Sequence, residues 1–139
     1  MDWKLEVVIA PVADVDRASA FYVDTLGFNL DTDFAPNEQF RVIQVTPPGS
    51  ACSIIFGTGL GGDMAPGSLK GAQFVVDDIE AAHTFLEERG VANSGPQHFV
   101  DGQMTAGADP EHADYGSFIY FDDPDGNSWA VQEVKHHAR

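Results

Sequence analysis

Apolar residues along this chain occur in two patterns, strand-like runs and a helical spacing, and the change from the first pattern to the second occurs twice. Apolar runs at 5–12 and 72–76 are typical of β-strands. Each run is followed by apolar residues three or four positions apart, the spacing of a helix with one buried face. Three further strand-like runs complete each half, near 28–34, 39–46 and 51–57 and near 91–99, 116–122 and 127–134. The pattern therefore predicts the order βαβββ, twice.

The two halves also repeat as sequence, since the segment at 12–22 recurs 64 positions later. Asp14 and Asp78 precede the two helical patterns, where a carboxylate can accept the free N–H groups of a first helical turn. Gly27 and Gly90 follow these patterns, and glycine adopts the left-handed conformation of a helix end without steric cost. The repeat predicts one helix per half, bounded by these residues.

The length of 139 residues corresponds to one domain. We expect a first module at 1–60, a linker at 61–69 and a second module at 70–135. No apolar run approaches the ~18 residues of a membrane helix, and the N-terminal residues lack the pattern of a signal peptide. Cys52 is the single cysteine, so no internal disulfide can form, which fits a reducing cytoplasm.

The charge of the chain limits its partners. With 22 acidic and 7 basic residues, the formal net charge is −15. Such a surface repels phosphate backbones, so we expect no nucleic-acid partner, and nothing in the sequence indicates a membrane partner. A solvated acidic surface explains the charge, and a field that gathers a cationic ligand is the alternative.

Three motifs lie in register with the repeat, at 12–28, at 76–82 and in the Asp-Pro-Asp-Gly-Asn turn at 123–127. Together they resemble the vicinal oxygen chelate superfamily of glyoxalases, bleomycin resistance proteins and extradiol dioxygenases, and the resemblance covers nearly the whole chain. It implies an α+β fold in which two βαβββ modules form a cupped mixed sheet. It also implies a homodimer, because members commonly pair with cavities between their cupped sheets.

The resemblance implies a metal site that these residues do not supply. Enzymes of the superfamily take a ligand seven positions before the aspartate that begins each helix, and a carboxylate three positions after the asparagine of the turn. Val7, Gly71 and Ala130 occupy those positions. None of the three side chains carries a donor atom for a transition metal, so we expect no metal and no other cofactor.

Two other donor sets remain open. Glu6 and Glu133 lie close to the implied ligand positions, but strand side chains alternate between faces, so both should point away from the cavity unless a bulge intervenes. A site made of His98, His112 and Asp114 is conceivable, although no spacing requires it.

The expected cavity face is apolar with a few polar groups. By parity with the implied ligand positions, the amides of Gln73 and Gln132 should face the cavity, and Phe118 and Tyr120 share one face of their strand. Amides and aromatic rings suit an organic ligand better than a metal. The ligand-binding residues predicted are Val7, Gln44, Gln73, Phe118, Tyr120, Ala130 and Gln132.

Two glycine-rich segments predict loops. Residues 57–62 match G-x-G-x-x-G, but loop residues follow where a dinucleotide site needs a helix, so a linker is expected. The segment at 100–116 predicts a long loop, either a lid over the cavity or a plain exposed loop.

Three functions remain in contention. The leading one is metal-independent binding or sequestration of a small organic molecule, as in the bleomycin-resistance branch, with antibiotic resistance as a consequence. The alternative is a metal-dependent lyase, isomerase or dioxygenase of the same superfamily that uses non-standard ligands. A third is a regulatory or interaction domain whose own side chains fill the cavity. The sequence leaves open whether any catalysis occurs.

Overall fold

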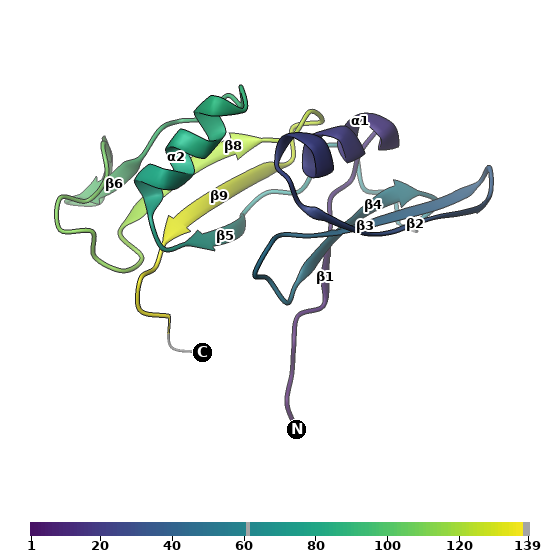
Figure 1. Ribbon diagram of the computed structural model, residues 1–139, viewed down its shortest axis with the longest axis horizontal. Coiled ribbons are helices and arrows are strands. Elements are labelled where there is room, and N and C mark those ends of the chain that lie inside the picture. Colours follow the sequence, from purple (N-terminus) through teal and green to yellow (C-terminus); the bar gives the residue numbers. More distant parts are fainter. Residues whose placement is uncertain (61, 138–139) are drawn as a thin grey trace. The chain divides into compact units, whose positions relative to one another are not determined.

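The computed structural model describes residues 1–60 and 62–137, which divide into two compact units (Figure 1). Unit 1 comprises Met1–Leu69 together with Asp123–Asn127, and unit 2 comprises Lys70–Asp122 and the chain from Ser128 onward. Each unit combines helix with a mixed sheet, so the predicted α+β fold of two βαβββ-like modules is confirmed, as two mixed sheets.

Unit 1 holds a four-stranded sheet of order β1-β4-β3-β2. Strand β1 runs parallel to β4, and the other neighbours are antiparallel. The elements are β1 (Val7–Ile9), α1 (Val15–Ser19), a π-helical segment η1 (Ala20–Thr25), β2 (Asn29–Asn37), β3 (Phe40–Thr46) and β4 (Ser53–Thr58).

Unit 2 holds a five-stranded sheet of order β5-β9-β8-β6-β7. Strand β5 runs parallel to β9, and the remaining pairs are antiparallel. The elements are β5 (Ala72–Val76), α2 (Ile79–Glu88), β6 (Gln97–Val100), β7 (Gln103–Ala106), β8 (Ser117–Asp122) and β9 (Ser128–Glu133).

The predicted aspartates begin both helical segments, and the predicted glycines follow them. The Asp14 carboxylate accepts a hydrogen bond from the Arg17 backbone N–H (3.0 Å), and Asp78 caps α2 in the same way. Gly27 and Gly90 follow the helices with φ of 73° and 69°. The repeat in the sequence is therefore a repeat of helix-capping geometry.

The first helix differs from expectation because it changes register after Ser19. Segment η1 makes wider turns, and the Leu26 N–H donates to the Phe21 carbonyl five residues earlier (2.9 Å). Such a π-helical insertion leaves the apolar spacing nearly intact, so the sequence pattern does not reveal it.

The prediction of a long loop at 100–116 is wrong in part, because a portion of this segment forms strand β7. Strands β6 and β7 form a hairpin whose two turn residues, Asp101 and Gly102, have φ of 50° and 78°. Two positive φ values in succession are the geometry of the turn that Asp-Gly favours in hairpins. That dipeptide is the local signal for the hairpin, and the glycine-rich composition of the segment obscures it.

Each unit buries one face of its sheet beneath its helix. In unit 1, Tyr22 is fully buried and stacks on Phe56 of β4, with ring centroids 5.4 Å apart. In unit 2, Trp129 is buried and stacks on Phe74 at 4.5 Å. Aromatic contacts of this kind contribute beyond the buried area alone, so each module has a core of its own.

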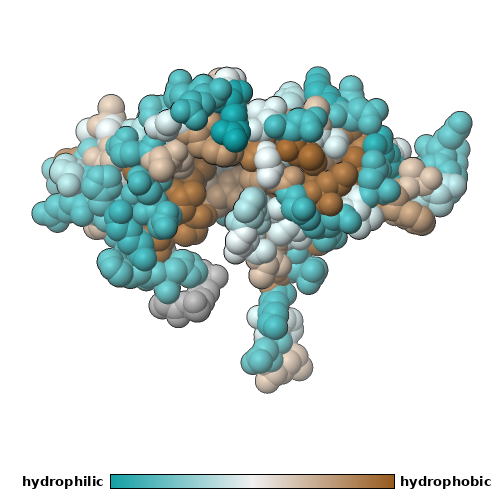
Figure 2. All heavy atoms as spheres, viewed as in Figure 1, coloured by the Kyte–Doolittle hydropathy of each residue, from teal (hydrophilic) through white to brown (hydrophobic). Residues whose placement is uncertain are grey.

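Helix α2 lies over β8 and β9 in unit 2 (Figure 1), and its outer side is mainly hydrophilic (Figure 2). Glu80, Thr84 and Glu87 provide exposed polar side chains there. Across the described residues, no helix has both the length and the apolar character needed to cross a membrane.

Candidate functional site

Five of the seven predicted ligand-binding residues lie together on the face of the unit 2 sheet opposite the buried Trp129. Register places Ala130 of β9 between Gln73 of β5 and Tyr120 of β8. Gln132 pairs with Phe118 one step along the same strands. This surface is called the open face of unit 2, and it consists of Gln73, Phe118, Tyr120, Ala130 and Gln132 together with Phe99.

Three aromatic rings form a continuous platform on this face. The Phe118 and Tyr120 rings are nearly parallel, at 7° with centroids 6.2 Å apart, and Phe99 meets Phe118 edge-on at 5.8 Å. Tyr120 is 39% exposed and Phe99 is 55% exposed. Parallel rings with exposed faces can stack on a flat apolar molecule. The sequence did not single out Phe99, because its contact with Phe118 depends on β6 pairing with β8.

The platform has amide groups close by. The Gln132 side chain donates to the Tyr115 carbonyl (3.2 Å), and Gln73 is exposed at the edge strand β5. Amides both donate and accept hydrogen bonds, so they can orient a ligand held by stacking. The open face of unit 2 therefore combines apolar area with a small number of polar groups.

The other two predicted residues, Val7 and Gln44, lie on the corresponding face of the unit 1 sheet. Val7 pairs with Ser53, and Gln44 pairs with Ile55, which in turn pairs with Ile9. The open face of unit 1 is defined by these residues and by Val42, whose partner is Gly57. It is a half-buried, largely aliphatic strip.

A polar cluster borders this strip, formed by Asn29, Asp31, Gln44, Thr46 and Ser53. The Asn29 amide donates to Asp31 (2.7 Å), the Gln44 amide lies 3.4 Å from it, and the Thr46 hydroxyl donates to it as well. The hydrogen bond from Thr46, with smaller contributions from Asn29 and Gln44, holds the pKa of Asp31 below its ordinary value.

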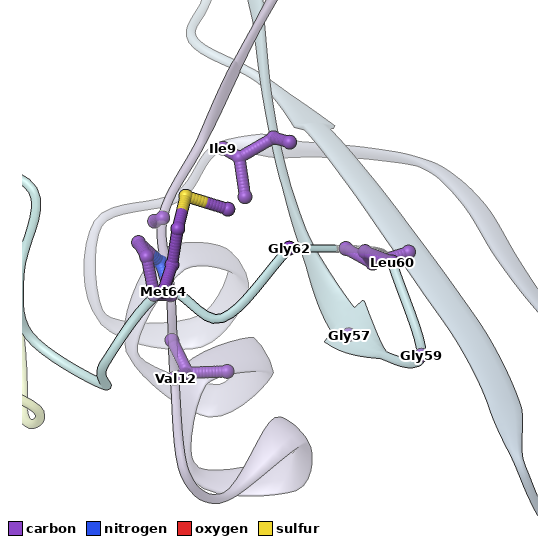
Figure 3. A pocket seen from close by; sticks show the side chains of 9 residues that line it. Ile9, Val12, Gly57, Gly59, Leu60, Gly62 and Met64 are labelled. Atoms are coloured by element: carbon purple, nitrogen blue, oxygen red, sulfur yellow. The ribbon is translucent and has the colours of Figure 1, made fainter.

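A small hollow of about 180 Å³ opens beside the same strip (Figure 3). Met64 reaches toward Ile9 on one side of it, and Leu60 lies beyond Gly62 on the other. Gly57 contributes bare backbone there, because a Cβ would lie 1.8 Å from the Arg41 carbonyl oxygen. The glycine at 57 thus follows from close packing of the backbone, and apolar side chains border the hollow beside it.

The positions where the resemblance implies metal ligands do not fit a metal. Val7 and Ala130 lie in β1 and β9 without donor atoms, and Gly71 precedes β5 with φ of 85°. Within 1–60 and 62–137, no three His, Cys, Asp or Glu side chains converge on one point. A transition metal needs such convergence, so the donor set at these positions does not suit one.

The side chain of Glu133 points to the helix side of its sheet, as strand parity predicted. It is fully buried, accepts a hydrogen bond from the Ile79 N–H at the start of α2 (2.8 Å), and lies 3.0 Å from His112 Nδ1. Glu6 is exposed and precedes β1. Neither carboxylate belongs to an open face.

The conceivable site of His98, His112 and Asp114 is wrong, because each residue has a different partner. His98 Nδ1 lies 2.7 Å from the Gly107 carbonyl oxygen, His112 contacts Glu133, and Asp114 pairs with His136 at 3.0 Å. These contacts fix the 107–116 segment and do not assemble a metal site.

The Asp-Pro-Asp-Gly-Asn turn has a structural role in unit 1. Asp123 accepts hydrogen bonds from the Tyr22 hydroxyl (2.7 Å) and from the Asn127 amide (2.7 Å). Asp125 is nearly buried and accepts from Arg17 (2.8 Å). The first and third sequence motifs therefore describe one hydrogen-bonded cluster, which explains why they occur together.

Known proteins of the same architecture match the chain over nearly its full length. The family model described as glyoxalase/bleomycin resistance protein/dioxygenase superfamily matches residues 4–131. No protein of curated function gives a significant match in sequence.

Three solved structures are informative. TnmS3, an antibiotic binding protein from Streptomyces sp. CB03234, is 33% identical over 96% of this chain and 97% of its own, with a TM-score of 0.75. A glyoxalase/bleomycin resistance protein from the same strain is 34% identical over 94% and 100% of the two chains, with a TM-score of 0.72. A superfamily member from Sphaerobacter thermophilus DSM 20745 is 28% identical over 95% and 98%, with a TM-score of 0.74.

Proposed function

Since the chain belongs to the glyoxalase/bleomycin resistance protein/dioxygenase superfamily, we propose that it binds and sequesters a small aromatic molecule without the help of a metal. The observation that carries the proposal is the open face of unit 2. There the implied ligand position is occupied by Ala130, and the neighbouring strand presents the aromatic platform.

The platform favours a planar ligand. A flat molecule can lie against the parallel Phe118 and Tyr120 rings, with Phe99 meeting it from the side and Gln73 or Gln132 hydrogen-bonding its polar edge. Small-molecule sites commonly combine apolar walls with a few polar groups in this way. TnmS3 is described as antibiotic-binding, which supports an antibiotic as the ligand and resistance as the result.

Two accompanying proposals concern the state of the protein. We propose a homodimer, supported by exposed apolar side chains outside the platform, such as Leu5, Leu30 and Val100, which a partner copy would cover. We propose a reducing cytoplasm as its compartment, supported by the single cysteine, Cys52.

A metal-dependent lyase, isomerase or dioxygenase is the alternative. Its strongest support is the pair of Glu133 and His112, two groups that ligate metals in other proteins. However, Glu133 is fully buried and already accepts from the start of α2. An interaction domain with a filled cavity fits less well, because Tyr120 and Phe99 are exposed.

The test is ligand binding by thermal shift and calorimetry with two- and three-ring planar aromatic compounds. A compound present at about 100 times its Kd should stabilise the protein by about 2.7 kcal/mol. We expect Tyr120→Ala to weaken binding about tenfold, in line with the loss of one aromatic contact.

Trp3→Ala is the matched control, because Trp3 is an exposed aromatic residue outside the open face of unit 2. It should leave the Kd unchanged. If no compound shifts the transition, or if both variants bind equally well, the proposed aromatic site is wrong.

A further inference from the structure

The open face of unit 1 ends at a carboxylate that faces the apolar strip and is not paired with a cation. No ion pair found within the described residues includes Asp31. All of its hydrogen-bonding neighbours are neutral: Asn29, Gln44 and Thr46. The cluster therefore holds a negative charge in a fixed position without neutralising it.

An irregularity in β2 directs this side chain to the open face. The pairing of β2 with β3 proceeds from Leu30 opposite Val45 directly to Thr32 opposite Gln44, so Asp31 is an extra residue in the strand. A bulge shifts the alternation of side chains and re-aims the extra one. Without it, Asp31 and Asp33 would lie on the same face.

With the bulge, the two aspartates have opposite environments. Asp33 pairs with Ile43, whose side chain is fully buried, and it is neutralised by two hydrogen bonds from Arg41 at 2.9 and 3.0 Å. Arg41 also binds Asp16 of α1 at 2.8 Å. The same short strand thus carries one paired carboxylate and one carboxylate without a cation.

The dimensions of the face suit a small ligand. Gln44 lies between the polar cluster and the aliphatic strip. Its side chain contacts Asp31, and its backbone pairs with Ile55, which lies next to Ile9 and the hollow. Asp31 is on β2 and Ile55 on β4, so two strand spacings, roughly 10 Å, separate the charge from the aliphatic surface. A two-ring aromatic body with a short side arm spans that distance.

Resting on the proposed function of small-molecule binding, we propose that Asp31 and its polar cluster form a subsite for a cationic group on the open face of unit 1, apart from the residues of the aromatic platform. The group would be an ammonium or amidinium that donates to the Asp31 carboxylate, while the attached apolar body lies on Ile9, Val42 and Ile55. The ligand class is therefore an aromatic or aliphatic amine of small size. A charge-assisted hydrogen bond of this kind is about twice as strong as a neutral one.

The test compares two probes of the same shape, naphthylmethylamine and naphthylmethanol, by calorimetry at neutral pH and low ionic strength. We expect the wild-type protein to bind the amine about tenfold more tightly than the alcohol, within the range of hydrogen bonds to charged groups. The preference should shrink at high salt, because Asp31 is exposed.

The decisive variant is Asp31→Asn, which keeps the shape of the side chain and removes its charge. It should bind the two probes within about twofold of each other. Asp24→Asn is the matched control, since Asp24 is an exposed carboxylate of η1 in the same unit and changes the net charge equally. It should keep the tenfold preference.

Each outcome separates the two proposals. Binding of both probes without discrimination, or a preference that survives in Asp31→Asn, overturns the cationic subsite and leaves aromatic binding standing. Failure of both probes to bind up to their solubility limit overturns the cationic subsite, and aromatic binding is then decided by the planar compounds and the Tyr120→Ala variant described above. Circular dichroism of Asp31→Asn at the working temperature establishes that the variant is folded.

Discussion

At the scale of single residues, Glu133 shows how a charged side chain can serve the fold. Its carboxylate is fully buried between the first N–H of α2 and His112. A buried carboxylate is tolerated only where hydrogen bonds or an opposite charge compensate for its lost hydration. Glu133 therefore joins strand β9 to the start of α2.

Replacing Glu133 with glutamine should destabilise the protein by about 1–3 kcal/mol, because the charge-assisted bonds to α2 and His112 are weakened in a buried environment. Urea denaturation measures the change. Glu88→Gln, at the exposed end of the same helix, should shift the free energy of unfolding by less than about 0.5 kcal/mol. Equal midpoints for the two variants would contradict the role of Glu133.

Asp109 makes stability depend on acid pH. The backbone N–H groups of Ala113 and, to a smaller extent, Glu111 donate to it and hold its pKa below the ordinary 3.8. A carboxyl group with a lowered folded-state pKa contributes stability above its unfolded pKa, and that stability is lost as the pH falls through the folded value. The contribution is therefore complete at neutral pH.

We expect Asp109→Asn to unfold at lower urea concentration than the wild type at pH 7, and the difference to shrink below the ordinary carboxyl pKa of 3.8. Urea midpoints measured from pH 7 downward test this. Asp2→Asn, in the exposed N-terminal segment, corrects for the change in net charge. A difference that stays constant with pH would show that Asp109 acts only through its shape.

At the scale of elements, the β6–β7 hairpin depends on two residues with positive φ. Gly102→Ala should destabilise the hairpin by about 1 kcal/mol, because alanine resists this conformation. Hydrogen exchange of the Gln103–Ala106 amides should accelerate while that of β9 stays slow. Asp101→Asn is the control, since Asn-Gly is equally suited to the turn. Unchanged exchange in Gly102→Ala would mean that the turn does not limit the hairpin.

The elements that could be predicted are those with local signals. The helix caps at Asp14 and Asp78 and the repeated strand pattern were visible because each depends on neighbours in sequence. The change to a π-helix at η1 cannot be predicted from the sequence, since a π-turn leaves no compositional mark. Strand β7 could have been predicted, because the Asp101-Gly102 dipeptide is a local signal for a hairpin turn.

The residues of the candidate site likewise fall into those that local sequence patterns predict and those that they do not. Parity along a strand placed Gln73, Ala130 and Gln132 on one face, because alternation is a local property. The contributions of Phe99 and Asp31 needed information that the sequence pattern lacks. Phe99 requires the pairing of β6 with β8, and Asp31 requires the bulge in β2.

At the scale of the whole molecule, metal content tests the assignment of Val7, Gly71 and Ala130 as positions that cannot bind a metal. After incubation with Mn, Fe, Ni or Zn salts and gel filtration, elemental analysis should find less than about a tenth of an equivalent, because these side chains supply no ligand atoms. Retention of one equivalent of any of the four would overturn the assignment and bring the enzyme alternative forward.

The net charge of −15 should make self-association depend on salt. Two copies of an acidic chain repel each other, and added salt screens the repulsion between exposed charges. Light scattering after size exclusion should therefore show a larger dimer fraction at high than at low ionic strength. A protein that is monomeric at every ionic strength, at micromolar concentration, would rule out the proposed homodimer.

The bond between Tyr22 and Asp123 has a consequence for synthesis on the ribosome. The two residues are 101 positions apart, and the Tyr22 side chain is buried. At a synthesis rate of about 5–20 residues per second, roughly 5–20 seconds pass between the addition of Tyr22 and the addition of Asp123, which accepts this hydrogen bond. During that interval the first module is exposed to proteases and chaperones as an incomplete nascent chain. A ribosome that stalls before residue 123 therefore leaves a first module that lacks part of its own core.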